Sequence, residues 1–398
     1  MIVKADTILT GDGKTVLRGS GVLIDESGHI VKIAPTETLK AGRPEEKLLD
    51  YGDATILPGL TDMHVHLGHS ETQPDAGVYD EYLKGYLAVS RAKEALSLGI
   101  TTLRDVSGPN HLCGQLRLAA EKGYIGDIPH IIHTNRGITA TGGHGYPGDC
   151  LQVDGPDNLR QAVREEMREG ADWIKIMTSH RGDVSEYTQA ELDAAVDEAH
   201  RNHVKICVHA GTQPSIGMCI KAGFDTIEHG TFLTAEQAGE MAAKGIYWVP
   251  TIIAYTYAHE YLAARRNDTP ANSTDRTSQK FLDWFEAARD AYRDNFKANF
   301  GTGVTVLCGT DMVLLGAPTV PVNRELQYMV EYGITPVQAV AAATGNCAKA
   351  LGTAGIRGEL LPGAEADILV VSGDVSRDIT ALNNVVEVFL QGKSVHRA

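Results

Sequence analysis

The sequence predicts an α/β protein, namely a (β/α)₈ TIM-like barrel with a small β-sandwich domain formed from both chain ends. Three observations favour this fold class. The middle of the chain alternates short apolar runs with amphipathic helical stretches, the pattern of βα units around a parallel sheet. Both ends instead carry β-branched runs separated by Gly, Asp and Ser. The 398 residues exceed the ~250 residues of a typical barrel and leave room for a smaller second unit.

The small domain is predicted from residues 1–58 together with residues 360–398. The first part contains the strand-like runs "MIVKADTILTG", "SGVLIDESGHIVKIAP" and "ATILP". The last part returns to the same style in "ADILVVSGD" and "VVEVFLQGKSV". Because both segments lie outside the alternating region, we expect them to meet in one sandwich-like unit.

The barrel is predicted from residues 59–359. Its helical stretches include "DNLRQAVREEMREG" and "TQAELDAAVDEAHRNH". Eight apolar runs supply the candidate strands: "TDMHVHLG", "ITTLRDVS", "PHIIHTN", "WIKIMTS", "KICVHAG", "TIEHG", "YWVPTII" and "VTVLCGTD". An open doubly wound sheet is the alternative, although no G-x-G-x-x-G follows any of these runs. The polar segment 263–280 is expected to be a surface loop, with a flap beside the site as the alternative.

Composition excludes several classes of partner. The net charge is −15, and no basic cluster offers a surface for nucleic acid or an anionic membrane. No apolar run reaches the ~18 residues of a membrane helix, and the N-terminus lacks the apolar core of a signal peptide. The 6 cysteines are scattered without a C-x-x-C pair, which favours reduced thiols. We therefore expect a cytoplasmic protein with a small-molecule substrate, and a homo-oligomer is compatible with the sequence.

Histidines and one aspartate stand at the ends of the predicted strands. His64 and His66 alternate along one run, so both imidazoles point to the same face, although such a pair alone is weak evidence. His209, His229 and Asp311 each close a later run. The C-terminal strand ends of a barrel converge on one face, and buried ionisable groups there are costly unless they are paired or bind metal. These positions therefore predict a metal centre.

Lys175 interrupts the apolar run "DWIKIM". One interpretation is a lysine that reaches out to solvent or to a salt bridge at the strand end. The other is that its neutral amine reacts with carbon dioxide to form a carbamate, an anion that can bridge two metals. The residues alone leave both interpretations open.

Together these motifs resemble those of the amidohydrolase superfamily. Within it, the sequence looks like the imidazolonepropionase-related, Xaa-Pro dipeptidase (prolidase)-like group of metal-dependent hydrolases. The resemblance rests on "PGLTDMHVHLG", "TATGGHG", "DWIKIM", "VHAG", "TIEHG" and "CGTD", which extend from about residue 55 to residue 311. Beyond them, "TPVQAVAAATGNCAKALG" and "GELLPGAEADILVV" match the closing helix and the returning strand of the family.

The resemblance implies a binuclear metal centre. His64, His66 and Asp311 would bind the more buried cation, and His209 with His229 the more exposed one. N-carboxylated Lys175 would bridge the two cations together with a hydroxide. Imidazole and carboxylate ligands suit zinc, with manganese, cobalt or nickel as alternatives. Asp311 would take the proton of the attacking water and hand it to the leaving amine.

Three further residues are candidate substrate contacts. His144, in "TATGGHG", matches a histidine that the group places near the scissile carbonyl oxygen, so it is expected to stabilise the transition state. Tyr255 matches a tyrosine that contacts the substrate carboxylate, with Tyr257 as a close alternative. Arg181 stands where the group often has a Gly-rich turn. Its guanidinium could bind an anionic or carbonyl group of the substrate or could be a solvated loop charge.

The predicted function is metal-dependent hydrolysis of an amide-type C–N bond, in a dipeptide or an N-acyl amino acid. Hydrolysis of a cyclic amide, an aryl-urea or a carbamate is the alternative enzyme function. Mononuclear deaminase or imidazolonepropionase chemistry is less favoured, because such enzymes generally lack the bridging lysine. A non-enzymatic scaffold is disfavoured because all six ligand positions are present.

Overall fold

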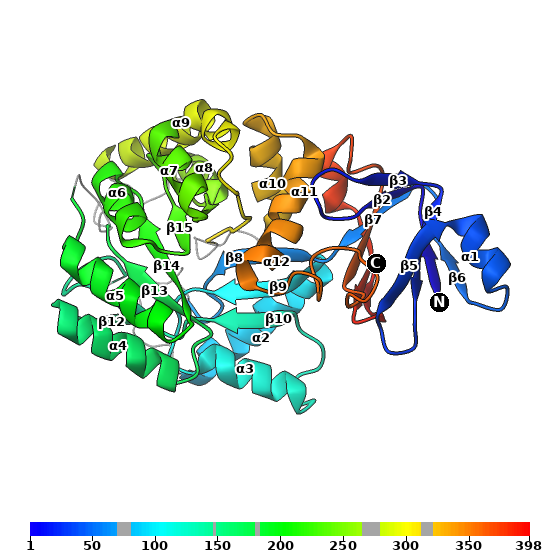
Figure 1. The fold of residues 1–398 in the computed structure, drawn as a ribbon, viewed down its shortest axis with the longest axis horizontal. Helices are drawn as coiled ribbons and strands as arrows, with labels where there is room; N and C mark the ends of the chain where they lie inside the picture. Colours follow the sequence, from blue (N-terminus) through cyan, green and yellow to red (C-terminus); the bar gives the residue numbers. More distant parts are fainter. Residues whose placement is uncertain (70–80, 146–148, 180–183, 265–278, 312–320) are drawn as a thin grey trace.

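The structure is a computed structural model, and it describes residues 1–69, 81–145, 149–179, 184–264, 279–311 and 321–398. Parallel strands flanked by helices make up the larger part, and two mixed, mainly antiparallel sheets lie at the side where both termini lie (Figure 1). The prediction of an α/β protein is confirmed. No helix in the described ranges has the length and apolar character needed to cross a membrane.

The parallel strands form two sheets. The smaller sheet has the order β10-β9-β8, with strands Leu60–Val65 (β8), Ile100–Asp105 (β9) and His130–His133 (β10). The larger sheet has the order β12-β11-β13-β14-β15-β16. Its strands are Gly137–Thr139 (β11), Cys150–Gln152 (β12), Trp173–Met177 (β13), Lys205–Ala210 (β14), Thr226–His229 (β15) and Tyr247–Val249 (β16).

The eighth predicted run, residues 304–311, is not a regular strand but is hydrogen-bonded on both sides. Val306 forms an isolated parallel bridge with Trp248 of β16, and the Leu307 N–H donates to the Trp248 carbonyl at 2.8 Å. On the other side, the Met63 N–H donates to the Cys308 carbonyl at 2.9 Å. This segment therefore connects β16 with β8.

Helices cover the outer side of these strands. In Figure 1, α4 to α7 form a row outside β13, β14 and β15. Several helices begin where a threonine side chain accepts a backbone N–H three residues later, as Thr188 does from Glu191 at the start of α5. The helices of this part are Glu81–Ser97 (α2), Leu112–Glu121 (α3), Pro156–Arg168 (α4), Gln189–Arg201 (α5), Gln213–Ala222 (α6), Ala235–Lys244 (α7), Ile252–Ala264 (α8), Gln279–Gly301 (α9), Val322–Glu331 (α10), Pro336–Ala342 (α11) and Gly345–Leu351 (α12).

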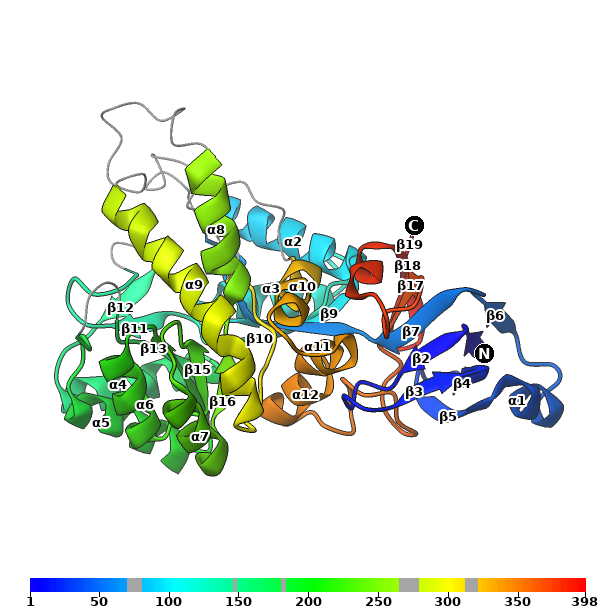
Figure 2. The ribbon, with the colours of Figure 1, turned by 90° about the horizontal axis from the view of Figure 1, so that it is seen from above.

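The surface loop predicted for residues 263–280 is shorter in the structure, because helices occupy both of its ends. Residues 263–264 complete α8, and Gln279 already begins α9. Residues 265–278 lie outside the described part. Figure 2 shows α8 and α9 side by side, projecting away from the strands. Because the segment is polar, the sequence did not predict that α8 ends and α9 begins within it.

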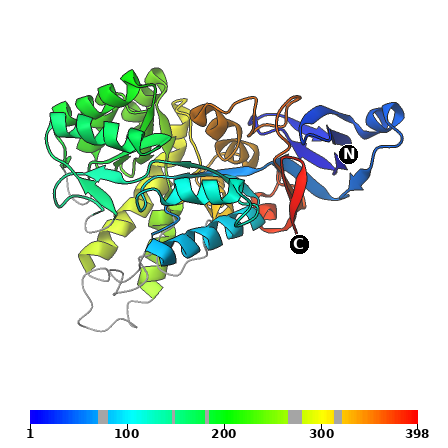
Figure 3. The same ribbon diagram turned by 90° about the horizontal axis from the view of Figure 1, so that it is seen from below.

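The two ends of the chain share a sheet, as Figure 3 shows. A six-stranded sheet has the order β19-β18-β17-β7-β2-β3, and β17 pairs antiparallel with β7. A four-stranded sheet, β5-β4-β1-β6, comes from the N-terminal part alone. The strands are Ile2–Lys4 (β1), Thr7–Leu9 (β2), Val16–Arg18 (β3), Ser20–Ile24 (β4), Ile30–Pro35 (β5), Leu48–Asp50 (β6), Ala54–Pro58 (β7), Ile368–Ser372 (β17), Val385–Leu390 (β18) and Lys393–Arg397 (β19).

Apolar side chains of both mixed sheets lie in one buried cluster. Val3 and Val22 come from the four-stranded sheet, and Ile56, Ile368 and Phe389 come from the six-stranded sheet. Two short helical segments in these chain ends were not predicted, Thr36–Gly42 (α1) and the 3₁₀ helix Ile379–Asn383 (η2). A separate, larger cluster joins the parallel strands to their helices.

Candidate metal centre

His64 in β8, His66 directly after it and Asp311 at the end of the eighth run form one compact group. His64 and His66 lie two residues apart, so their rings emerge on the same face of the chain. The Asp311 Oδ1 lies 3.5 Å from His64 Nε2 and 3.2 Å from His66 Nε2. One donor atom from each of these residues lies within 4.8 Å of the others, a spacing that fits a single cation. The donor set of two imidazoles and a carboxylate suits zinc and other first-row divalent metals.

A second pair of histidines lies beside this group. His209 is the penultimate residue of β14 and His229 is the last residue of β15, and their ring centroids are 4.4 Å apart. The His229 ring is 5.0 Å from the His64 ring, so the two groups are neighbours. The structure thus brings together the four histidines and the aspartate that the sequence singled out.

Lys175 lies at the centre of β13 and is 2% exposed. Its charge acts on both His64 and His229, which places the lysine close to both groups. Among the residues that the structure describes, no carboxylate forms an ion pair with its amine. A buried ammonium without a counter-ion is costly, whereas a carbamate at this position would be an anion among metal ligands.

The Nδ1 atoms of three histidines form hydrogen bonds with other groups of the protein. His66 Nδ1 lies 2.7 Å from the Ser107 carbonyl oxygen and therefore donates to it. His64 Nδ1 lies 2.8 Å from Glu228 Oε2, and His229 Nδ1 lies 2.7 Å from Thr251 Oγ1. A proton on Nδ1 leaves the Nε2 lone pair free, which is the tautomer that a metal ligand needs.

The Glu228 carboxylate that contacts His64 also forms a buried ion pair with Arg104. Glu228 Oε1 accepts from Arg104 Nη2 at 2.7 Å, and both side chains are fully buried. Arg104 Nε also donates to the Met63 carbonyl at 2.6 Å, and its guanidinium lies 4.7 Å from the Trp173 ring. Neither Arg104 nor Glu228 was predicted from the sequence as a site residue. Each is a charged residue inside an apolar run, which is the signal that pointed to Lys175.

Three turns at the site have positive φ at residues other than glycine. The φ angles are 67° at His229, 49° at Thr251 and 51° at Asp311. Such a conformation costs on the order of 1–3 kcal/mol and persists only where the surroundings enforce it. Asp62 holds the turn before Asp311, because its carboxylate accepts from the Thr310 N–H at 3.0 Å and the Thr310 hydroxyl at 2.6 Å.

Burial is the largest influence on the pKa values of the ionisable side chains at this centre. Burial, with the nearby charge of Lys175, lowers the pKa of His64 and of His229 well below the usual range, so both rings are neutral near pH 7. Burial also lowers the pKa of His66, but Asp311, together with Asp105 and the Ser107 carbonyl, outweighs burial and raises that pKa. Burial raises the pKa of Asp62 to about 7, against the hydrogen bonds that favour its carboxylate.

Two of the candidate substrate residues lie next to the histidines. The His144 ring stacks on the His209 ring at 3.9 Å, and the His144 N–H donates to Glu186 Oε2 at 2.9 Å. The Tyr255 ring meets the His229 ring edge-on at 5.6 Å. Burial raises the pKa of Tyr255 strongly, so its hydroxyl keeps its proton. Arg181 lies outside the described residues.

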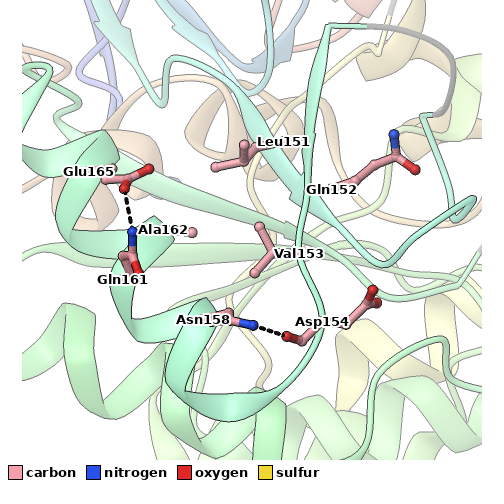
Figure 4. Close-up of a pocket in the computed structure, with 8 residues that line it drawn as sticks. All are labelled: Leu151, Gln152, Val153, Asp154, Asn158, Gln161, Ala162 and Glu165. Carbon is pink, nitrogen blue, oxygen red and sulfur yellow. Dashed lines mark hydrogen bonds between the residues drawn. The ribbon is translucent and has the colours of Figure 1, made fainter.

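Other polar groupings in the described part are separate from this centre. His130, Glu365 and Asp367 also come together, but Arg357 already holds Glu365 through Nη2 at 2.7 Å. A surface depression of about 370 Å³ lies between residues 151–154 and α4 (Figure 4). Its lining residues include none of the metal-ligand candidates.

The sequence matches the model of the amidohydrolase family over residues 55–395. Ochratoxinase of Aspergillus niger is 28% identical over 95% of this chain and 82% of its own length. Imidazolonepropionase of Salinispora arenicola is 24% identical over 91% of this chain and 88% of its own length. These matches extend over nearly the whole chain and confirm the predicted superfamily.

A solved structure gives the same assignment. A Xaa-Pro dipeptidase with bound methionine in its active site aligns with a TM-score of 0.85 and 29% sequence identity. The alignment covers 99% of this chain and 98% of the dipeptidase. The family and this neighbour together imply a TIM-like barrel with an extra domain.

Proposed function

Because the chain belongs to the amidohydrolase family, we propose that it hydrolyses an amide-type C–N bond, in a dipeptide or an N-acyl amino acid, at a two-metal centre. The observation that carries the proposal is the convergence of His64, His66 and Asp311 with a second histidine pair. Ochratoxinase and Xaa-Pro dipeptidase, the relatives named above, support the choice of an amide bond.

The residues fit two divalent cations, with zinc as the proposed metal. His64, His66 and Asp311 would hold one cation, and His209 with His229 would hold the other. Lys175 would bridge them as a carbamate. In that reaction its neutral amine forms an N–C bond to carbon dioxide and loses a proton to solvent. Its burial and its closeness to both groups support this assignment.

Each residue around the centre then has a defined task. When bound, two cations supply Lewis-acid chemistry by lowering the pKa of a water and polarising the scissile carbonyl. An Asp311 carboxylate oxygen accepts the proton of the attacking water and returns it to the leaving nitrogen. His144 donates a hydrogen bond to the substrate carbonyl oxygen, which becomes negative in the transition state. The stacking of its ring on His209, at the edge of the centre, supports this role.

We propose Tyr255 rather than Tyr257 as the contact to a substrate carboxylate. Its ring lies against His229, and its protonated hydroxyl is a hydrogen-bond donor. Arg181 is proposed as a second anchor for an anionic or carbonyl group. Both assignments favour a substrate with a free carboxylate beside the scissile bond.

We also propose that the parallel strands close into a barrel and that the two chain ends form a second domain. Residues 59–359 would form an eight-stranded barrel, with residues 304–311 as the strand that closes the ring. The hydrogen bonds of this segment to both Trp248 and Met63 support closure. Residues 1–58 and 360–398 would form one β-sandwich domain, which the buried cluster shared by the two mixed sheets supports.

A metal analysis followed by a substrate screen tests the function. Purified protein never exposed to chelator is expected to carry about two divalent cations per chain, in line with the two donor groups. The screen would compare Xaa-Pro, Xaa-Arg and Xaa-Lys dipeptides and N-acyl amino acids with cyclic amides, aryl-ureas and carbamates. Fewer than one cation per chain would contradict the metal centre. Turnover confined to ureas or carbamates would overturn the substrate class.

A further inference from the structure

Glu325 is a buried acidic residue outside the proposed metal centre. It lies in the first turn of α10 and is fully buried, although glutamate is normally exposed. Helix α10 lies beside the start of α8 (Figure 2). Glu325 Oε1 accepts from the Ile252 N–H at 2.9 Å, and Oε2 accepts from the Ile253 N–H at 2.7 Å. The carboxyl group of Glu325 thus caps the N-terminus of another helix, where free N–H groups and the helix dipole favour negative charge, while burial raises the pKa of this group to about 8.

The capped turn begins directly after Thr251. This residue is buried and β-branched, and its φ of 49° is in the left-handed region that such residues avoid. Its hydroxyl lies 2.7 Å from the Pro250 carbonyl, to which it donates its single proton. The contact to His229 Nδ1 at 2.7 Å must therefore run from the imidazole N–H to the hydroxyl oxygen. Thr251 thereby fixes the tautomer of His229.

We infer that Glu325 is a positioning residue that holds His229 in its metal-binding tautomer and orientation by fixing the Thr251 turn. The path has three steps, from the Glu325 carboxyl oxygens to the first N–H groups of α8, from there to Thr251, and from the Thr251 hydroxyl to His229. Tyr255 stands one turn further along the same helix, so the cap also fixes its ring against His229. The inference deepens the proposed function and rests on its assignment of His229 as a ligand.

The test is a cation titration of metal-depleted Glu325→Gln and Thr251→Val proteins, with Co²⁺ absorption as the readout. Glutamine keeps the size but presents an NH₂ group to one of the two N–H donors, and valine keeps the branching but removes the hydroxyl. Two binding steps are expected in the wild-type titration. The step that disappears in the His209→Ala protein is assigned to the site formed by His209 and His229. At this site, we expect each variant to bind about 10–100-fold more weakly. At the site of His64, His66 and Asp311, affinity should change less than about threefold.

Two control variants separate positioning from mere stability. Leu192→Ala removes a fully buried side chain of α5 and should lower Tm without a selective loss at either metal site. Glu331→Gln changes an exposed glutamate at the end of α10 and should change nothing. In the double variant Glu325→Gln/Thr251→Val the loss should not exceed that of the worse single variant, because both act on one path. If Glu325→Gln lowers Tm while both affinities stay at wild-type values, Glu325 is only a helix cap.

A metal-free measurement distinguishes this inference from the proposed function. In ¹⁵N-histidine NMR of the metal-depleted protein, wild-type His229 should be protonated at Nδ1, and Glu325→Gln should give a mixture of tautomers. An unchanged His229 tautomer in Glu325→Gln would overturn the positioning role. If the wild-type protein binds no second cation, the two-metal proposal fails, whereas the NMR result still decides the role of Glu325.

Discussion

Buried charged residues in apolar strands are the most informative residues of this chain. A charge in such a place loses its hydration, so it needs a metal, a counter-ion or several hydrogen bonds. Lys175 could be recognised from the sequence for this reason, and Arg104 carries the same signal in the run "ITTLRD". Glu325 could not be recognised. It lies in a helix, where glutamate is ordinary, and its partner Ile253 is 72 residues away in the sequence.

At the proposed bridge, Lys175→Ala should reduce hydrolysis by more than about 100-fold, since even outer residues of a metal site can cost 10–100-fold. Short carboxylic acids added to the assay should restore part of the activity, because they can replace the missing carbamate. Lys221→Ala, at an exposed lysine of α6, serves as the matched control and should keep wild-type rates. Steady-state kinetics with and without added acid measures both effects, and a fully active Lys175→Ala protein would exclude the bridging role.

Gly309 permits the close approach of the eighth run to β8. A Cβ atom there would lie 2.4 Å from Val249 Cγ1 and 2.9 Å from His64 Cβ. We expect Gly309→Ala to cost about 1–3 kcal/mol in the free energy of unfolding, the usual effect of overpacking. Gly239→Ala, in α7 with no atom within 4 Å of its Cβ position, should instead gain about 0.5–1 kcal/mol. Urea unfolding of both variants is the measurement, and equal effects would contradict the steric argument.

At the scale of elements, the sequence predicts which segments form strands better than it predicts their pairing. The apolar runs mark β8, β13, β14 and β15 because buried parallel strands are apolar throughout. The run 304–311 has the same composition, yet it pairs through only two backbone hydrogen bonds with β16 and two with the chain around β8, too few for a regular strand. Regular pairing depends on the register of both neighbours, which local composition does not encode.

The contact between α4 and α5 should depend on pH. Glu198 of α5 lies 2.8 Å from Arg164 Nε and 3.4 Å from Arg160 Nη1 of α4. The hydrogen bond from Arg164, assisted by Arg160, lowers the pKa of Glu198 to about 2 from 4.5. A lowered folded-state pKa gives stability that is complete above about pH 4.5 and is lost as the pH falls toward 2.

Glu198→Gln should therefore be less stable than the wild type at neutral pH, and the difference should shrink between pH 4.5 and 2. Urea unfolding across this range measures the difference. Glu236→Gln, at an exposed position of α7, should give no such trend. A stability difference that stays constant down to pH 2 would show that the ion pair does not carry the effect.

At the scale of the whole molecule, ligands from several strands couple the metal centre to global stability. Any cation that binds the folded chain and not the unfolded chain stabilises it, by about 2.7 kcal/mol at 100 times its Kd. Chelation should therefore lower Tm, and restored zinc should raise it steadily with the logarithm of zinc concentration. Differential scanning calorimetry at several zinc concentrations checks this. A Tm independent of zinc would indicate that no cation binds the native state preferentially.

The six-stranded sheet pairs two strands that are translated before and after the parallel strands. β7 is translated before the parallel strands, but its neighbour β17 begins at Ile368 of a 398-residue chain. During translation the edge of β7 that faces β17 must stay unpaired until the intervening parallel strands have been translated and β17 has emerged. A product that terminates early, for instance before Ile368, therefore exposes an apolar strand edge, which favours aggregation and gives quality-control proteases a means to recognise incomplete chains.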